Sequence, residues 1–277
     1  MTLPVGIMQG RLVPPFEGRF QTFPAAAWRD EFEHARRAGL ASIEWIYEVP
    51  HEADNPLGSD AGVAEMRSLM AQTGVMVRSI CADYYMQSRL IVDGQAQRPM
   101  VDHLKWLIGR AGALELWYII LPFVDASSLR TPTDRAAVQA LLAEVLPFAA
   151  QHGIELHLET DLPPREFLAL IESVGHPQLK ANYDIGNSAS LGFDPEEELT
   201  LLGPLLGSVH VKDRVLRGAT VPLGTGNADF PTCFRLIKAA GYARPFILQA
   251  ARGAAGDEVR WNMHNREFVE QIAGALP

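Results

Sequence analysis

The chain has 277 residues, of which 48% are hydrophobic, and a formal net charge of −9. This length is close to the roughly 250 residues of a typical (β/α)8 barrel, and the apolar content excludes a disordered chain. The negative charge without any Lys/Arg run argues against a nucleic-acid partner, and no apolar run approaches the ~18 residues of a membrane-spanning helix.

Short β-type apolar segments alternate with amphipathic helical segments along the whole chain. The predicted strands are residues 5–8, 42–48, 75–82, 117–124, 154–160, 179–185, 208–212 and 245–250. The predicted helices are residues 25–38, 61–73, 101–113, 135–152, 164–174, 195–206, 230–240 and 258–275. Several of these helices are followed by a glycine, which favours a left-handed C-terminal cap.

Eight alternating units predict a parallel sheet that closes into a single (β/α)8 barrel. The alternative is an open doubly wound sheet, which usually has fewer strands and often a glycine-rich phosphate turn after the first one. Residues 8–20, MQGRLVPPFEGRF, follow the first strand and lack a GxGxxG pattern. No linker or break in composition divides the chain, so we expect one domain over residues 1–277.

The two cysteines, Cys81 and Cys233, lie in apolar stretches and have no CxxC spacing, which predicts buried, reduced thiols. The N-terminal segment has no basic region followed by an apolar one, as a signal peptide would. We therefore expect a cytoplasmic protein.

Polar side chains occur at the carboxyl ends of four neighbouring predicted strands, where barrel enzymes place their active sites. They are Glu159, Asp184, His210 and Gln249. Buried carboxylates require a cation or hydrogen-bond partners, and one divalent ion would explain all four side chains. Oxygen and nitrogen ligands without thiolate suit Mn²⁺, Mg²⁺, Co²⁺ or Zn²⁺. The alternative is a metal-free network of salt bridges.

Further candidate substrate contacts lie near other strand ends. Glu44 and Asp83, on the second and third strands, could contact sugar hydroxyls. Lys212, Arg214 and Arg252 lie at or beyond the ends of the last two strands, where many barrels bind phosphate. The arginine fork suits phosphate or carboxylate, whereas the alternative for these cations is pairing with nearby acidic residues.

The segments LHLET, NYDIGN, VHVKDR, VPLGTGNADF and FILQAAR make the chain resemble the xylose-isomerase-like barrel superfamily of sugar and sugar-phosphate isomerases and epimerases. The resemblance covers essentially the whole chain. It implies one divalent metal held by a Glu, an Asp, a His and a Glu on the fifth to eighth strands. Glu159, Asp184 and His210 match in type, whereas Gln249 replaces the last glutamate. MQGRLVPPFEGRFQTFP, EWIYE, SICADYYM and DIGNSAS further resemble an uncharacterised, divergent bacterial subgroup.

The resemblance also implies catalytic roles. In epimerases of this superfamily the two glutamates are the acid/base pair that flanks the substrate carbon. Glu159 can serve as ligand and base, but Gln249 can only donate a carbonyl oxygen and cannot take up a proton. A substrate-contacting histidine of the family is replaced by Asn187, which we expect to bind substrate. The candidates for a different proton donor are Lys212, Asp213 and His157.

The resemblance implies a metal-dependent isomerase or epimerase of a sugar or sugar phosphate. A metal-polarised carbonyl acidifies the neighbouring C–H, and a carboxylate removes the proton. The same first half-reaction permits a dehydratase acting on a keto-sugar or cyclitol. Because Gln249 cannot transfer a proton, a non-catalytic sugar-binding barrel is a further alternative. The DNA-repair endonuclease branch requires extra His ligands and a basic groove, which are missing. A homo-oligomer would fit barrels of this class.

Overall fold

The computed structural model describes residues 4–275, and within them eight parallel strands close into a barrel. The barrel strands are β1 (Val5–Met8), β2 (Ser42–Ile46), β3 (Met76–Cys81), β6 (Tyr118–Phe123), β7 (Glu155–Thr160), β8 (Leu179–Asp184), β9 (Leu206–Val211) and β12 (Phe246–Leu248). They are hydrogen-bonded in chain order, and β12 pairs with β1 to close the barrel. The predicted (β/α)8 barrel is confirmed.

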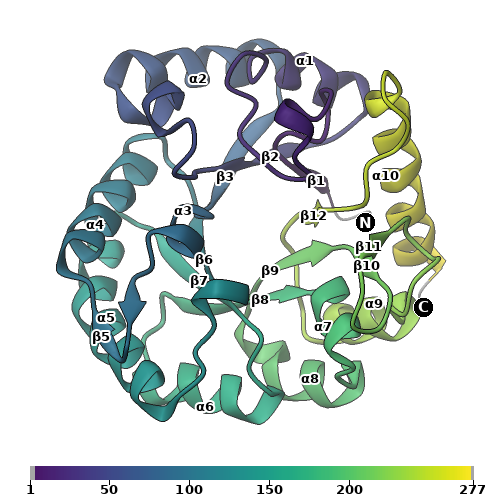
Figure 1. Ribbon diagram of the computed structural model, residues 1–277. Helices are drawn as coiled ribbons and strands as arrows, with labels where there is room; N and C mark the ends of the chain where they lie inside the picture. The colour runs from purple at the N-terminus through teal and green to yellow at the C-terminus, as the bar shows by residue number, and fades with distance from the viewer. Residues whose placement is uncertain (1–3, 276–277) are drawn as a thin grey trace.

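A ring of helices surrounds the strands, as Figure 1 shows in a view along the barrel axis. These helices are α1 (Asp30–Arg37), α2 (Asp60–Thr73), α4 (Arg98–Ala113), α5 (Pro132–Gln151), α6 (Pro164–Val174), α8 (Pro195–Leu202), α9 (Phe230–Ala239) and α10 (Glu258–Ala275). None of the helices in the described part of the chain is long and apolar enough to cross a membrane.

Among the predicted helices, the first and the sixth differ most from the structure at their ends. The first begins at Asp30 rather than at residue 25, because residues 25–29 form turns. The sixth ends at Leu202, and the 3-10 helix η5 (Gly203–Leu205) follows it. Pro204 explains this end, because proline has no backbone N–H and cannot continue an α-helix.

Several short elements were not predicted, and most lie in loops at the carboxyl ends of the strands. They are the helices α3 (Tyr84–Gln87) and α7 (Ile185–Leu191), the hairpins β4 (Ile91–Val92) with β5 (Gln95–Ala96) and β10 (Asp213–Arg214) with β11 (Thr220–Val221), and the 3-10 helices η1 (Phe16–Gly18), η2 (Glu52–Asp54), η3 (Pro56–Gly58) and η4 (Asp125–Ser127). In Figure 1, α3, α7 and the β10–β11 hairpin lie inside the ring of outer helices. These short elements build the rim of the barrel mouth.

The two faces of the strands differ in polarity. In β7, Leu156 and Leu158 belong to the apolar core, whereas His157 and Glu159 alternate with them and make polar contacts to β8 and β9. Successive residues of a strand point to opposite faces, so the polar side chains lie inside the barrel. Cys81 and Cys233 are buried free thiols, as predicted.

Candidate metal centre

Three side chains converge at the carboxyl end of the barrel. Glu159 comes from β7, Asp184 from the end of β8 and His210 from β9, and Asp184 is the register partner of His210. One potential ligand atom from each lies within 4.8 Å of those of the other two, and all three residues are buried. This arrangement can hold a metal ion, as the sequence predicted for these three residues.

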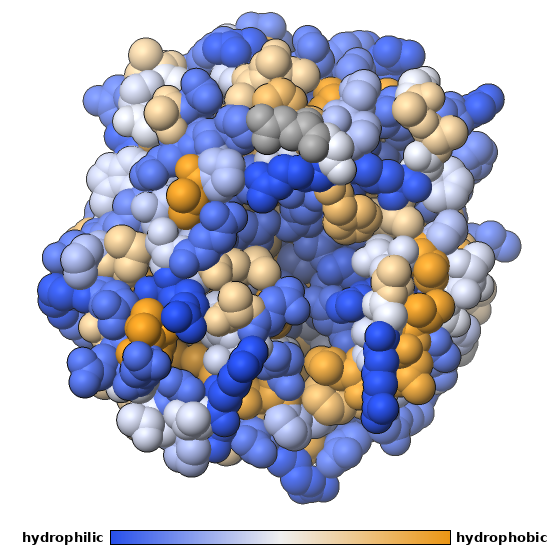
Figure 2. All heavy atoms as spheres, viewed as in Figure 1, coloured by the Kyte–Doolittle hydropathy of each residue, from blue (hydrophilic) through white to orange (hydrophobic). Residues whose placement is uncertain are grey.

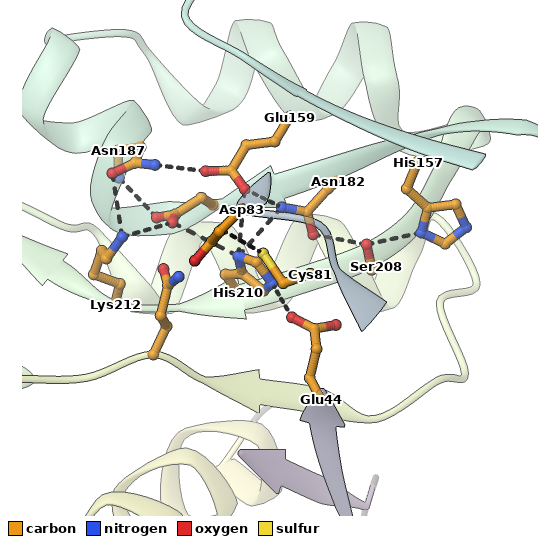
Figure 3. Close-up of polar contacts among 12 residues, drawn as sticks. Glu44, Cys81, Asp83, His157, Glu159, Asn182, Asn187, Ser208, His210 and Lys212 are labelled. Carbon is orange, nitrogen blue, oxygen red and sulfur yellow. Dashed lines mark hydrogen bonds and ion pairs between the residues drawn. The ribbon is translucent and has the colours of Figure 1, made fainter. Parts of the chain in front are cut away.

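The imidazole of His210 is held from behind by Glu44 (Figure 3). Its Nε2 lies 2.6 Å from Glu44 Oε1, and Ser79 Oγ donates to the other Glu44 oxygen at 2.8 Å. The opposite nitrogen, Nδ1, lies 3.7 Å from Glu159 Oε2 and 3.8 Å from Asp184 Oδ2. A carboxylate on one imidazole nitrogen typically orients the other towards a metal. Nδ1 is therefore the atom of His210 suited to bind one.

Without a cation, the cluster compensates its carboxylate charges by retaining protons and by the contact with Lys212. Burial and repulsion from Asp184 raise the pKa of Glu159 to about 7. Burial opposes the charge of Asp184, but Lys212 and His210 outweigh it and hold its pKa well below the usual range. Burial also opposes the charge of His210, yet Glu44, Asp184 and Glu159 raise its pKa to about 10. A divalent ion would replace the protons that the cluster otherwise retains.

Gln249 follows β12 and provides an independent test of whether the residues fit a metal. Its Nε2 donates to Gln21 Oε1 at 3.1 Å. Its Oε1 is buried, and among residues 4–275 it has no hydrogen-bond partner. A buried acceptor without a donor is costly, and a cation would satisfy it. The donor set therefore fits a divalent ion, with Gln249 Oε1 suited as an additional ligand.

A sequence model of the xylose isomerase-like TIM barrel family matches residues 32–267. The chain belongs to this family. A 3-oxo-isoapionate decarboxylase of Pectobacterium atrosepticum is 28% identical over 231 residues, covering 72% of this chain and 80% of that protein. An L-ribulose-5-phosphate 3-epimerase of Escherichia coli is 24% identical over 257 residues, covering 88% and 89%. Two different reactions thus occur among similar proteins.

Two solved structures share the fold. An L-ribulose 3-epimerase superposes with a TM-score of 0.76 at 20% identity, covering 99% of this chain and 95% of that one. A family protein of Mycobacterium smegmatis in complex with magnesium superposes with a TM-score of 0.74 at 22% identity, covering 100% and 98%. At this identity the superpositions establish the barrel fold alone.

Lys212 and Asn187 lie directly against the cluster in this family member. Lys212 Nζ donates to Asp184 Oδ2 at 3.1 Å and to Asn187 Oδ1 at 3.4 Å. Asn187, in α7, donates from Nδ2 to Glu159 Oε1 at 2.7 Å. Arg214 extends the group, because its Nη1 donates to Asn187 Oδ1 at 2.9 Å. The structure thus brings Lys212, Asn187 and Arg214 together beside the cluster. Their catalytic and substrate-binding roles stay predictions.

The other predicted contacts have different surroundings. Both oxygens of Glu44 are bonded to His210 and Ser79 and the side chain is fully buried, so the observed role is to support His210. Arg252 donates to the backbone carbonyls of Gly10, Val13 and Phe20 in the loop after β1. Their contacts with substrate stay predictions.

Two further candidates for a proton donor are engaged in structural contacts. Asp213 is buried and accepts from the backbone N–H groups of Gly226 and Ala228. His157 is buried between Glu155 and Ser208, which lie 3.0 and 2.9 Å from its ring nitrogens. Of the three candidates, Lys212 is the one that contacts the cluster directly.

Two residues near the cluster received no role from the sequence. Asn182 donates from Nδ2 to Glu159 Oε2 at 3.1 Å. The two-residue period of β8 puts Asn182 on the same face as Asp184, and this pattern could have indicated a role for it. Gln21 donates to Asp83 Oδ2 at 2.7 Å and accepts from Gln249. It lies in an irregular loop, and no periodic pattern indicates its position. Burial raises the pKa of Asp83, its partner.

The barrel mouth leaves room beside the cluster. A cavity of about 300 Å³ is lined in part by Asn187, Arg214, Arg217, Thr160 and Asp161. Figure 2 shows this end of the molecule hollowed near its centre, with mostly hydrophilic residues in and around the hollow. Because Asn187 also contacts Glu159, the cavity adjoins the candidate metal centre.

Proposed function

We propose that the chain is a divalent-metal-dependent isomerase or epimerase of a sugar or sugar phosphate. The observation that carries this proposal is the convergence of Glu159, Asp184 and His210 at the barrel mouth. The unpaired oxygen of Gln249 adds to it, and similar proteins act as epimerases on ribulose compounds. Mn²⁺, Mg²⁺, Co²⁺ and Zn²⁺ all suit such ligands.

Glu159 is the proposed general base. When bound, a divalent ion supplies Lewis-acid polarisation of the substrate carbonyl, which acidifies the adjacent C–H. Glu159 takes that proton as a positioned carboxylate, the side chain of the cluster suited to general-base catalysis. Asn182 and Asn187 orient the carboxylate by donating one hydrogen bond to each of its oxygens.

The route of the second proton distinguishes isomerisation from epimerisation. Glu159 alone can return the proton to the neighbouring carbon on the same face, which gives aldose–ketose isomerisation. Epimerisation requires a donor on the opposite face, and Gln249 cannot supply a proton. Lys212 is the proposed donor because its ammonium carries three N–H groups and contacts Asp184.

The cavity beside the cluster is the proposed place for the far end of the substrate. Arg214 and Arg217 line it, and guanidinium groups suit phosphate or carboxylate. Arg214 also contacts Asn187, which links the cavity to Glu159. A phosphorylated or carboxylated sugar could therefore place its anionic end here and its carbonyl at the cluster.

Decarboxylation of a 3-oxo sugar acid is a second candidate function. It is favoured by Gln249, because loss of CO2 leaves an enediol that requires a single protonation and no second carboxylate. The similarity to the 3-oxo-isoapionate decarboxylase also supports this candidate function. The proposed isomerase or epimerase would release no CO2.

The test is deuterium incorporation from D2O into a panel of ketoses, ketose phosphates and 3-oxo sugar acids, with the protein loaded with Mn²⁺. We expect deuterium at a carbon next to the carbonyl and a product otherwise unchanged in mass. Glu159→Gln should abolish the exchange, whereas the matched control Glu33→Gln, on the exposed surface of α1, should retain it. Loss of water would indicate a dehydratase, and CO2 release a decarboxylase. Binding without exchange would indicate a sugar-binding barrel.

A further inference from the structure

The loop between β1 and α1 reaches into the barrel mouth through Gln21. This side chain makes three hydrogen bonds. Its Oε1 accepts from Arg11 Nη2 at 3.0 Å and from Gln249 Nε2 at 3.1 Å. Its Nε2 donates to Asp83 Oδ2 at 2.7 Å. Gln21 thus connects the loop to residues at the ends of the third and eighth barrel strands.

The neighbours of Gln21 allow only one orientation of its carboxamide. An arginine side chain has donors and no acceptor, so Arg11 must face the oxygen of Gln21. Burial lowers the pKa of Arg11 only to about 9, so it stays charged at neutral pH. On the other side, the carboxylate of Asp83 accepts from the amide N–H2 of Gln21.

The orientation of Gln21 in turn determines that of Gln249. Because Gln21 presents its oxygen, Gln249 must present its N–H2 group to it. The Gln249 oxygen then points the other way, and it is the buried atom for which residues 4–275 provide no donor. If the carboxamide of Gln249 were flipped, its oxygen would face the oxygen of Gln21, and its N–H2 group would point towards the site of the cation.

We propose that Arg11 and Gln21 are positioning residues that hold the carboxamide of Gln249 with its oxygen towards the metal. This inference rests on the metal site of the proposed function. A carboxylate at position 249 would present an oxygen in either orientation, whereas a carboxamide does so in only one. A glutamine at this position therefore depends on a neighbour that fixes its orientation.

The loop has other anchors, so Gln21 is not required to hold it in place. Arg252 donates to the carbonyls of Gly10, Val13 and Phe20. On the other side of Gln21, the backbone N–H of Phe23 donates to Glu48 at 2.6 Å. Loss of the Gln21 side chain should consequently change the orientation of Gln249 more than the course of the loop.

The experiment measures the dissociation constant of Mn²⁺ by calorimetry in a double-mutant cycle. In the wild-type background, we expect Gln21→Met to weaken Mn²⁺ binding by roughly 10- to 100-fold, the range typical of residues that orient ligands. In the Gln249→Glu background it should weaken binding by less than about threefold, because the carboxylate needs no orientation. Arg19→Met, in the same loop, is the matched control and should behave like wild type.

Each outcome either supports or overturns the inference. Equal losses in both backgrounds, or no loss in the wild-type background, would overturn it while leaving the metal site intact. Absence of Mn²⁺ binding by the wild-type chain would reject the proposed metal site and the inference with it. Arg11→Met provides a second variant, with the same expected pattern, in case Gln21→Met does not fold as judged by circular dichroism.

Discussion

Glu159 and Asp184 are neighbouring buried carboxylates with opposite pKa shifts. Asp184 is stabilised as an anion by Lys212 and His210, whereas burial and the charge of Asp184 raise the pKa of Glu159 to about 7. Different environments commonly divide two carboxylates into a permanent charge and a proton carrier. These opposite shifts are consistent with the proposed roles of Asp184 as a fixed ligand and of Glu159 as the base.

Binding of a divalent ion should release protons. His210 has a pKa of about 10 without a cation and must lose its proton before Nδ1 can bind a metal. As pH rises towards 10 the proton competes less, so affinity should increase by up to about tenfold per pH unit for one displaced proton. Calorimetry at pH 8 in buffers of different ionisation enthalpy should give about one proton released per Mn²⁺ bound. A pH-independent affinity with no proton release would contradict this account.

Glu44 should influence metal affinity although it does not face the metal. Glu44→Gln removes the negative charge beside Nε2 of His210 that orients the imidazole. We expect Mn²⁺ to bind roughly 10- to 100-fold more weakly. The matched control Glu65→Gln changes an exposed pair with Arg29 and should leave the affinity unchanged. An unaltered dissociation constant in Glu44→Gln would show that this contact does not tune the centre.

The sequence predicted the residues that lie on strands better than those that lie on loops. Glu159, Asp184 and His210 follow from strand ends and from the two-residue period, and the structure brings them together. Gln21 could not be predicted, because its position depends on the path of an irregular loop between β1 and α1. The two-residue period of β8 puts Asn182 on the same face as Asp184, but its hydrogen bond to Glu159 depends on side-chain geometry that the period does not specify.

At the scale of elements, strands β7, β8 and β9 share a column of polar contacts inside the barrel. His157 is hydrogen-bonded to Glu155 through one ring nitrogen and to Ser208 through the other, and Ser208 donates to Asn182 Oδ1 at 2.7 Å. Figure 3 shows this chain of contacts from His157 to Glu159 and His210 in the candidate metal centre. At its lower end Arg244 pairs with Glu155 at 2.6 Å. The column satisfies polar groups that the barrel interior would otherwise leave unpaired.

Replacement of His157 should destabilise the barrel. His157→Leu leaves Ser208 and Glu155 without this partner and removes a ring stacked 4.1 Å from that of Tyr118. We expect the free energy of unfolding to fall by about 2 kcal/mol, measured by urea denaturation. His264→Leu, on the exposed surface of α10, is the matched control and should change it by less than about 0.5 kcal/mol. Equal stability of the two variants would show that the column contributes little.

The elements themselves were predictable to different degrees. Every barrel strand lies within or near its predicted range, because short segments of β-type sequence alternate recognisably with amphipathic helical segments. The β10–β11 hairpin and α7 were missed, since two-residue strands and a seven-residue helix in a loop give no periodic signal. These short elements matter for function, because α7 carries Asn187 and β10 carries Arg214.

At the scale of the whole molecule, the centre is assembled from strands far apart in sequence. Glu44 and His210 are separated by 166 positions, and Gln21 and Gln249 by 228. Only closure of the barrel brings these pairs together, because β12 pairs with β1. The alternation of eight β and α units was sufficient to predict this closure. A ligand bound at the centre should consequently stabilise the closed barrel as a whole.

Metal binding should therefore increase global stability. An ion that binds the folded chain and not the unfolded one adds about 2.7 kcal/mol to the free energy of unfolding at a hundred times its dissociation constant. We expect this gain with Mn²⁺ in urea denaturation of the wild-type protein. Asp184→Asn should show no such gain over the same concentrations. Equal stabilisation of both proteins would point to ion binding elsewhere.

The central claim is that Glu159, Asp184 and His210 hold a divalent ion. Elemental analysis of the purified protein and of Asp184→Asn, at matched protein concentration and after reconstitution with Mn²⁺, Co²⁺ or Zn²⁺, tests it most directly. The account predicts about one ion per wild-type chain and its loss in the variant. Absence of metal from the reconstituted wild type, or its full retention in Asp184→Asn, would contradict the claim.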